Sequence, residues 1–258
     1  FHKDVHQVIL RAREVGIEKI LMPNIDSKSI KPMLTIETNY PNFCLPMIGL
    51  HPCSVNYNYE NELAEVSYWL KKRKFIAIGE IGTDLYWDQS FWPEQQKAFL
   101  QQSQWALDYD LPIVIHSRSS IAETIDLIRP YAIKGLKGVF HCFTGSKKFA
   151  FNLIDLGGYI SASGVVTFKK SDELANTFKE LPNNKILVET DRKKIWRHSF
   201  EATETRVVDK TGAGDFFAAG YLYGLQKDLT VDKSANFANK SAAHVISEIG
   251  VRPKRKFN

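Results

Sequence analysis

Cysteine is scarce in this 258-residue chain, which contains only Cys44, Cys53 and Cys142. An odd number of cysteines without a Cys-x-x-Cys pair excludes a disulfide framework and is typical of proteins from a reducing compartment. No apolar run reaches the roughly 18 residues that a membrane-spanning helix needs, and residues 1–15 form an amphipathic segment unlike a signal peptide. The sequence therefore predicts a cytoplasmic protein without a membrane partner.

Neither sign of charge is in large excess, because 34 Lys and Arg face 29 Asp and Glu for a net charge of +5. With 44% hydrophobic and 24% charged residues, the composition excludes a disordered chain, collagen and a coiled coil. The basic runs 71–74 and 252–256 indicate an anionic partner only weakly, since such runs are often solvated ends of elements. The length suits either one α/β barrel or two smaller domains.

Short apolar runs alternate with segments of helical periodicity, which predicts βα units around a parallel sheet. Seven runs have the composition of strands, namely 19–22, 46–50, 75–79, 112–115, 138–140, 159–161 and 185–189. The clearest helical patterns carry Leu63, Val66 and Leu70, and run from Pro93 through Phe99. Seven strands are one short of a TIM barrel, and the missing strand would precede Phe1. Because the chain does not open on Met, we expect it to be part of a longer product.

Polar residues follow four of the predicted strands, at the edge where such a barrel keeps its chemistry. They are Glu80, His116, His141 and Asp191. A strand-end histidine alone is more often a hydrogen-bonded structural residue than a ligand. Four such residues at matching positions favour a site, because a buried polar cluster without a task is costly. The set suits a divalent metal that polarises a substrate oxygen.

The motifs around these residues are Gly-Leu-His-Pro at 49–52, Gly-Glu-Ile-Gly-Thr-Asp at 79–84, Ile-His-Ser-Arg at 115–118, His-Cys-Phe-Thr-Gly at 141–145 and Glu-Thr-Asp at 189–191. In this order and spacing, residues 1–191 resemble the TatD-type metal-dependent hydrolases, which include deoxyribonucleases of TIM-barrel fold. The resemblance implies a divalent metal, Zn, Mg or Mn. Its implied ligands are Glu80, shared by two metals, His116 and His141 for one metal, and Asp191 for the other, with Asp191 also accepting a proton.

The same resemblance implies supporting or phosphate-binding roles for His51, Asp84 and Arg118. The alternative for the last two is a simple ion pair across the rim of the barrel. The chain departs from the family in lacking the His-x-His pair of the first strand. His2 and His6 could share one helix face, but they follow the place of that strand and lack the glutamate of an HExxH motif. Glu80, His116 and His141 then remain for one metal, and only Asp191 and Glu80 for the other.

A second pattern begins after Asp191, where residues 207–215 read Val-Val-Asp-Lys-Thr-Gly-Ala-Gly-Asp and Ala238-Asn239 follows. Residues 192–258 resemble the C-terminal part of the ribokinase-like (PfkB) sugar and nucleoside kinases. Glycines before a helix allow a tight turn whose N–H groups attract phosphate, although a short glycine turn is also a common helix cap. The resemblance implies an anion hole at Gly212, Ala213 and Gly214, Asp215 as general base, and Ala238 and Asn239 near an adenine. Lys210 replaces a threonine that is usual in the family.

The sequence thus predicts an α/β chain in two parts. Residues 1–191 are expected to form a TIM-barrel-like hydrolase without its first strand, and residues 192–258 a kinase-like α/β fragment without its substrate-binding half. We expect weak metal-dependent hydrolysis of a phosphodiester, in nucleic acid or a small phosphoester, with Asp191 assisting proton transfer and Arg118 holding the phosphate. One alternative is an ATP-dependent sugar or nucleoside kinase, with ATP bound only if the fragment works. The other is a non-catalytic chimera, and at the kinase-like fragment we expect an anion site without phosphoryl transfer.

Overall fold

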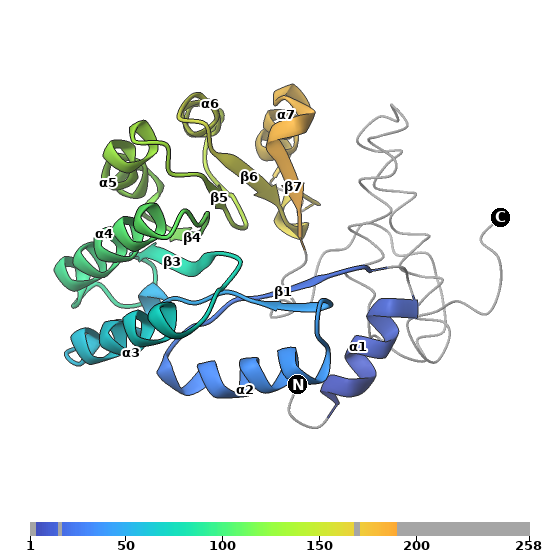
Figure 1. Cartoon of the computed structure of the whole chain (residues 1–258). Helices are drawn as coiled ribbons and strands as arrows, with labels where there is room; N and C mark the ends of the chain where they lie inside the picture. The colour runs from blue at the N-terminus through green and yellow to red at the C-terminus, as the bar shows by residue number, and fades with distance from the viewer. Residues whose placement is uncertain (1–3, 15–16, 168–170, 190–258) are drawn as a thin grey trace. The chain divides into compact units, whose positions relative to one another are not determined.

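The computed structural model describes residues 4–14, 17–167 and 171–189 (Figure 1). The chain divides into two compact units, one of residues 19–162 and 177–187, the other of residues 1–18, 163–176 and 188–258. Within the second unit lie α1 (Val5–Glu14), the 3₁₀ turn η2 (Gly164–Thr167) and the first part of α7 (Asp172–Glu180). The predicted boundary after residue 191 and the whole kinase-like segment lie outside the described residues.

The strands of the first unit are parallel and follow one another in chain order. β1 (Ile20–Met22) pairs with β2 (Cys44–Pro46), and an isolated parallel bridge between Ile48 and Ile78 leads on to the larger sheet. That sheet has the order β3 (Ile78–Asp84), β4 (Ile113–Arg118), β5 (Gly138–Phe140), β6 (Tyr159–Ala162) and β7 (Ile186–Val188). Parallel strands in sequential order, each reached through a helix, are the architecture of a (β/α) barrel. The predicted α/β fold is confirmed.

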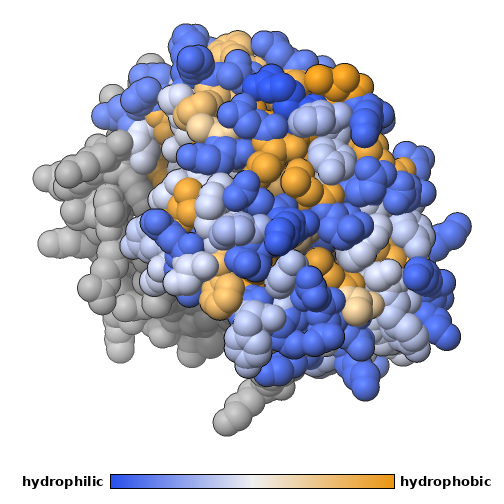
Figure 2. Space-filling model, turned by 90° about the vertical axis from the view of Figure 1, so that its left-hand side faces the viewer, coloured by the Kyte–Doolittle hydropathy of each residue, from blue (hydrophilic) through white to orange (hydrophobic). Residues whose placement is uncertain are grey.

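Helices cover the outer side of these strands (Figure 1). They are α2 (Ser27–Asn39), α3 (Tyr59–Lys72), α4 (Trp92–Asp108), α5 (Ile121–Ile133) and α6 (Lys147–Asp155), with short 3₁₀ turns η1 (Pro52–Ser54) and η3 (Asn183–Lys185). α3 buries Leu63, Val66 and Leu70, the face that its periodicity predicts. Figure 2 shows a mainly hydrophilic surface with scattered apolar side chains, as expected where helices turn their polar faces to water.

Among the described residues, no helix combines the length and the apolar character needed to cross a membrane.

Strands β3 and β4 run further than their apolar composition predicts. The predicted strands end at Gly79 and Ile115, whereas the observed ones continue to Asp84 and Arg118. The pairing of Gly82 with His116 continues to Asp84 with Arg118, so backbone hydrogen bonding outlasts the apolar run. Glu80 and His116 therefore lie within strands and not after them.

Candidate metal centre

Glu80 lies among three histidines at the centre of the candidate site. Its Oε1 is 3.2 Å from Nδ1 of His116, 3.6 Å from Nε2 of His141 and 3.7 Å from Nε2 of His51. Glu80 comes from β3, His116 from β4, His141 follows β5, and His51 precedes η1. Because neighbouring parallel strands end at one edge of the sheet, these distant positions meet there.

The electrostatics of the cluster favour an ionised carboxylate facing imidazole rings. Burial by itself would raise the pKa of Glu80, but hydrogen bonds with His116 and His51 and the charge of His141 hold that pKa well below its usual range. Burial would lower the pKa of His116, yet its bonds with Asp84 and Glu80 raise it. Carboxylate oxygen and imidazole nitrogen are the donors that Zn²⁺ and related divalent ions accept. The donor set therefore fits the metal that the sequence predicts.

Asp84 holds His116 in place and is almost fully buried, with 1% of its surface exposed. Its Oδ2 lies 2.8 Å from Nε2 of His116, and its Oδ1 accepts the backbone N–H groups of Tyr86 at 2.8 Å and Trp87 at 3.1 Å. Burial acts to raise the pKa of Asp84, but these hydrogen bonds outweigh it and lower the pKa to about 2. Asp84 is thus a carboxylate that orients the histidine from behind.

Arg118 is the register partner of Asp84 in the strand pairing, but its side chain is engaged elsewhere. Its guanidinium carbon lies 3.6 Å from the ring centroid of Tyr86 and 5.3 Å from that of Trp87. Asp84 bonds to His116 instead. Asp84 and Arg118 therefore do not form the ion pair across the rim that the sequence left open as an alternative.

Two buried glutamines of α4 form hydrogen bonds with the backbone segments that contain the site residues. The Gln95 side chain bonds the backbone N–H and C=O of Asp84, at 2.8 and 3.2 Å. Gln102 bonds the backbone of Leu50, next to His51, in the same way, at 2.7 and 3.2 Å. Neither residue was predicted from the sequence. The available signal was a polar residue recurring seven positions apart on a helix face otherwise occupied by Phe99 and small residues.

Asn24 and Cys53 are two further residues that the sequence did not single out. Asn24 is fully buried, its backbone bonds Gly79 and Glu80, and its Oδ1 accepts the N–H of Gly49 at 3.2 Å. Cys53 of η1 is an exposed residue, and its Sγ lies 3.4 Å from Oδ2 of Asp84. Partial burial, followed by the charge of Asp84, raises the pKa of this thiol to about 12, so that it donates to the carboxylate.

Several predicted site residues lie outside the part of the chain that the structure describes. They are Asp191, the proposed ligand of a second metal, and the kinase-like set Gly212, Ala213, Gly214, Asp215, Ala238 and Asn239. The roles of these residues stay predictions. His6, which the sequence analysis rejected as a ligand together with His2, lies on α1.

A sequential parallel βα sheet with a buried carboxylate among histidines at one edge places the protein among the metal-dependent hydrolases of barrel fold. The family model for TatD related DNase matches residues 1–211. The relative named uncharacterized metal-dependent hydrolase YabD, of Bacillus subtilis, is 32% identical over 200 residues, which span 78% of each chain. The 3'-5' ssDNA/RNA exonuclease TatD of Edwardsiella piscicida is 30% identical over 192 residues, spanning 74% of each. The chain belongs to the TatD-related DNase family.

Solved structures agree with this assignment. The crystal structure of the TatD homologue YJJV of Escherichia coli is 26% identical, superimposes with a TM-score of 0.75, and is matched over 94% of this chain and 92% of its own. A second family model, the pfkB family carbohydrate kinases, matches residues 193–256. Both resemblances predicted from the sequence are thereby confirmed, and the hydrolase match runs to residue 211, beyond the predicted limit of 191.

Proposed function

We propose that the protein hydrolyses phosphodiester bonds in nucleic acid with the help of a divalent metal ion. The observation that carries the proposal is the Glu80 carboxylate, with one oxygen 3.2 to 3.7 Å from ring nitrogens of three histidines. Nucleic acid is favoured as substrate because the relative from Edwardsiella piscicida is named an exonuclease of single-stranded DNA and RNA.

The roles follow from the donor atoms and their surroundings. Glu80, His116 and His141 would hold one cation, and their two imidazoles favour Zn over Mg. A bound cation supplies Lewis-acid polarisation of a phosphate oxygen. Asp84 orients His116, and Arg118 offers a guanidinium to the substrate phosphate. Hydrolysis adds water across the phosphorus–oxygen bond, and we assign acceptance of the water proton to Asp191.

Removing the metal should abolish the activity. Protein dialysed against a chelator is expected to cleave a labelled oligonucleotide only at background rate, and Mn²⁺ or Zn²⁺ should restore cleavage, because the chain's own carboxylates and imidazoles cannot replace the Lewis acid. The measurement is product release by gel electrophoresis, with metal content checked by elemental analysis. Full cleavage by protein shown to hold no metal would contradict the proposal.

Two exposed aromatic rings beside Arg118 suggest how unpaired bases would be held. Tyr86 and Trp87 are 54% and 69% exposed, and their rings meet edge to face with centroids 4.9 Å apart. Aromatic rings next to a guanidinium form a stacking surface for the bases of a single strand. The bases of a duplex are already stacked on one another and are not free to bind in this way.

Trp87→Ala is therefore expected to weaken binding of single-stranded DNA by about 1–3 kcal/mol. Fluorescence anisotropy of a labelled oligonucleotide in chelator, where no cleavage occurs, measures this. Tyr68→Ala is the matched control, since Tyr68 on α3 is also an exposed ring with a cation, Lys72, over it. Equal losses in the two variants, or an equal loss for duplex DNA, would show that Trp87 does not stack on bases.

The match of residues 193–256 supports a division into a hydrolase segment, 1–191, and a kinase-like segment, 192–258. For the second segment we propose an anion site at Gly212 to Gly214 that does not transfer phosphate. Phosphoryl transfer needs both substrates and magnesium held in line with a base such as Asp215, and the kinase family model matches only residues 193–256.

A further inference from the structure

The two ring nitrogens of His116 face different groups. Nδ1 is 3.2 Å from Oε1 of Glu80, within the candidate metal centre. Nε2 is 2.8 Å from Oδ2 of Asp84, on the opposite side of the ring. Sγ of Cys53 lies 3.4 Å from this same Asp84 oxygen. A thiol, an imidazole and a carboxylate therefore meet on the side of His116 that the Glu80 centre does not use.

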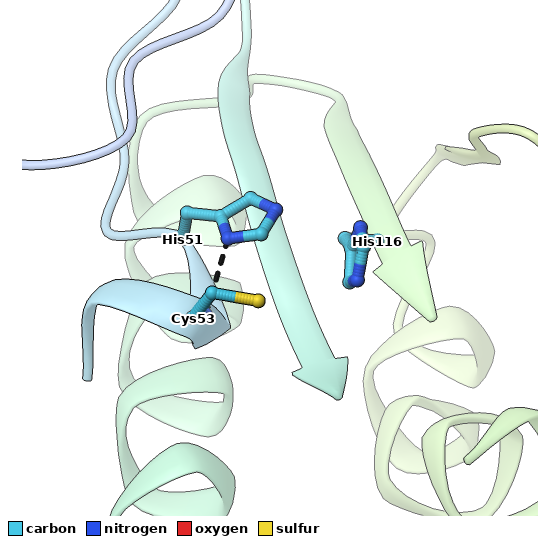
Figure 3. A group of neighbouring side chains, drawn as sticks. All are labelled: His51, Cys53 and His116. Carbon is cyan, nitrogen blue, oxygen red and sulfur yellow. Dashed lines mark hydrogen bonds between the residues drawn. The ribbon is translucent and has the colours of Figure 1, made fainter. Parts of the chain in front are cut away.

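His51 extends this second cluster. One ligand atom each from His51, Cys53 and His116 can be chosen so that all three lie within 4.8 Å of one another. Figure 3 shows the Cys53 sulfur pointing toward His116 and the His51 ring above it. The N–H of Cys53 donates to Nδ1 of His51 at 3.1 Å, which fixes the His51 ring against the turn that carries the thiol.

The donors and their spacing match a site for a soft cation. Zinc-type sites place sulfur at about 2.3 Å and nitrogen or oxygen at about 2.0–2.2 Å from the metal, so neighbouring ligand atoms stand roughly 3–4 Å apart. The sulfur to oxygen distance of 3.4 Å lies in this range, and the nitrogen to oxygen distance of 2.8 Å needs only a small widening. Thiolate selects Zn²⁺ and similar ions, whereas Mg²⁺ and Mn²⁺ prefer oxygen.

We propose that Cys53, Asp84 and His116, with His51 beside them, form a second cation site that is selective for thiophilic divalent ions and shares His116 with the Glu80 centre. As the metal–sulfur bond forms, the thiol proton passes to solvent, and no oxidation takes place. The exposure of Cys53 lets an ion reach the site from solution, which the buried Cys44 does not allow.

Sharing one histidine has a consequence for regulation, and this part of the inference rests on the proposed function. An ion bound through Nε2 of His116 would draw the ring toward Cys53 and Asp84, away from Glu80. At concentrations above those that fill the Glu80 centre, a thiophilic ion would then inhibit hydrolysis by competing for His116.

Cadmium titration tests the site directly, because a cadmium–thiolate bond adds a charge-transfer absorption in the ultraviolet difference spectrum that a site of only oxygen and nitrogen lacks. Metal-free protein should show this band with one equivalent of Cd²⁺. Cys53→Ser and Cys53→Ala should abolish it and weaken Cd²⁺ binding by about 100-fold or more, since even outer partners of metal ligands account for 10- to 100-fold. The serine keeps a hydrogen-bond donor to Asp84, so loss of the band cannot be assigned to loss of that bond.

Cys142→Ser is the matched control, because Cys142 follows His141 at the same edge of the sheet. It should keep the band. A band lost in Cys142→Ser and kept in Cys53→Ser, or no band in the wild-type protein, would overturn the proposed site.

Mn²⁺ binding separates this inference from the proposed function. Cys53→Ser should bind Mn²⁺ as the wild type does, whereas Glu80→Gln should lose Mn²⁺ binding and keep the cadmium band. A missing band beside intact Mn²⁺ binding refutes the second site alone. Missing Mn²⁺ binding beside an intact band refutes the Glu80 centre alone. If Cd²⁺ inhibits Cys53→Ser as strongly as the wild type, competition through His116 is wrong.

Discussion

Glu80→Gln should abolish divalent-metal binding at the candidate centre and, with it, metal-dependent hydrolysis. The substitution keeps the shape of the side chain but removes the negative charge that three imidazoles share. An amide offers a cation one neutral oxygen, and its NH₂ group adds donors among rings that already carry donors. We expect Mn²⁺ affinity to fall by about 100-fold or more, because loss of a ligand exceeds the 10- to 100-fold effect of outer partners.

Isothermal titration with Mn²⁺ measures the binding, and oligonucleotide cleavage measures the activity. Glu65→Gln is the matched control, since Glu65 is an exposed glutamate of α3 and its replacement should change neither quantity. Thermal unfolding of the metal-free proteins shows whether Glu80→Gln stays folded. A folded Glu80→Gln protein with wild-type Mn²⁺ affinity would rule out Glu80 as a ligand.

Gly82→Ala should give the largest loss of stability of any single methyl group added within β3. Gly82 has φ of +139°, and a Cβ there would stand 2.0 Å from the carbonyl oxygen of His116. That oxygen belongs to the backbone of the neighbouring strand, so it cannot move aside without breaking the pairing of β3 with β4. We expect the free energy of unfolding to fall by about 3–5 kcal/mol, the sum of an unfavourable backbone and an overpacked contact.

Gly135→Ala separates these two contributions. Gly135 also has a positive φ, +98°, but a Cβ there meets nothing within 4 Å. Its replacement should lower stability only by about 1–3 kcal/mol, the cost of the backbone conformation. Chemical denaturation of both variants gives the comparison. Similar losses in the two would mean that the contact with the carbonyl oxygen of His116 adds no cost beyond that of the backbone conformation.

Much of the fold was predictable because it depends on local patterns. The apolar runs at 138–140 and 159–161 are short, bounded by glycine or polar residues, and form β5 and β6 close to the predicted limits. Composition predicted the ends of strands less well where pairing with a neighbouring strand determines how far a strand continues. β3 and β4 continue through Thr83 and Ser117, which no apolar pattern marks as strand, because each strand supplies the other's hydrogen bonds.

The sequence by itself determined the order of the strands and the candidate residues at their ends, since a parallel βα chain places every strand end at one edge. Only the tertiary structure decided which side chains meet there. It paired Asp84 with His116 and left Arg118 on the ring of Tyr86, although the carboxylate of Asp84 could equally have paired with the guanidinium of Arg118. It also brought Cys53 to the far side of His116. Such choices depend on the register of neighbouring strands and on the buried glutamines of α4, which are long-range contacts that residue spacing does not encode.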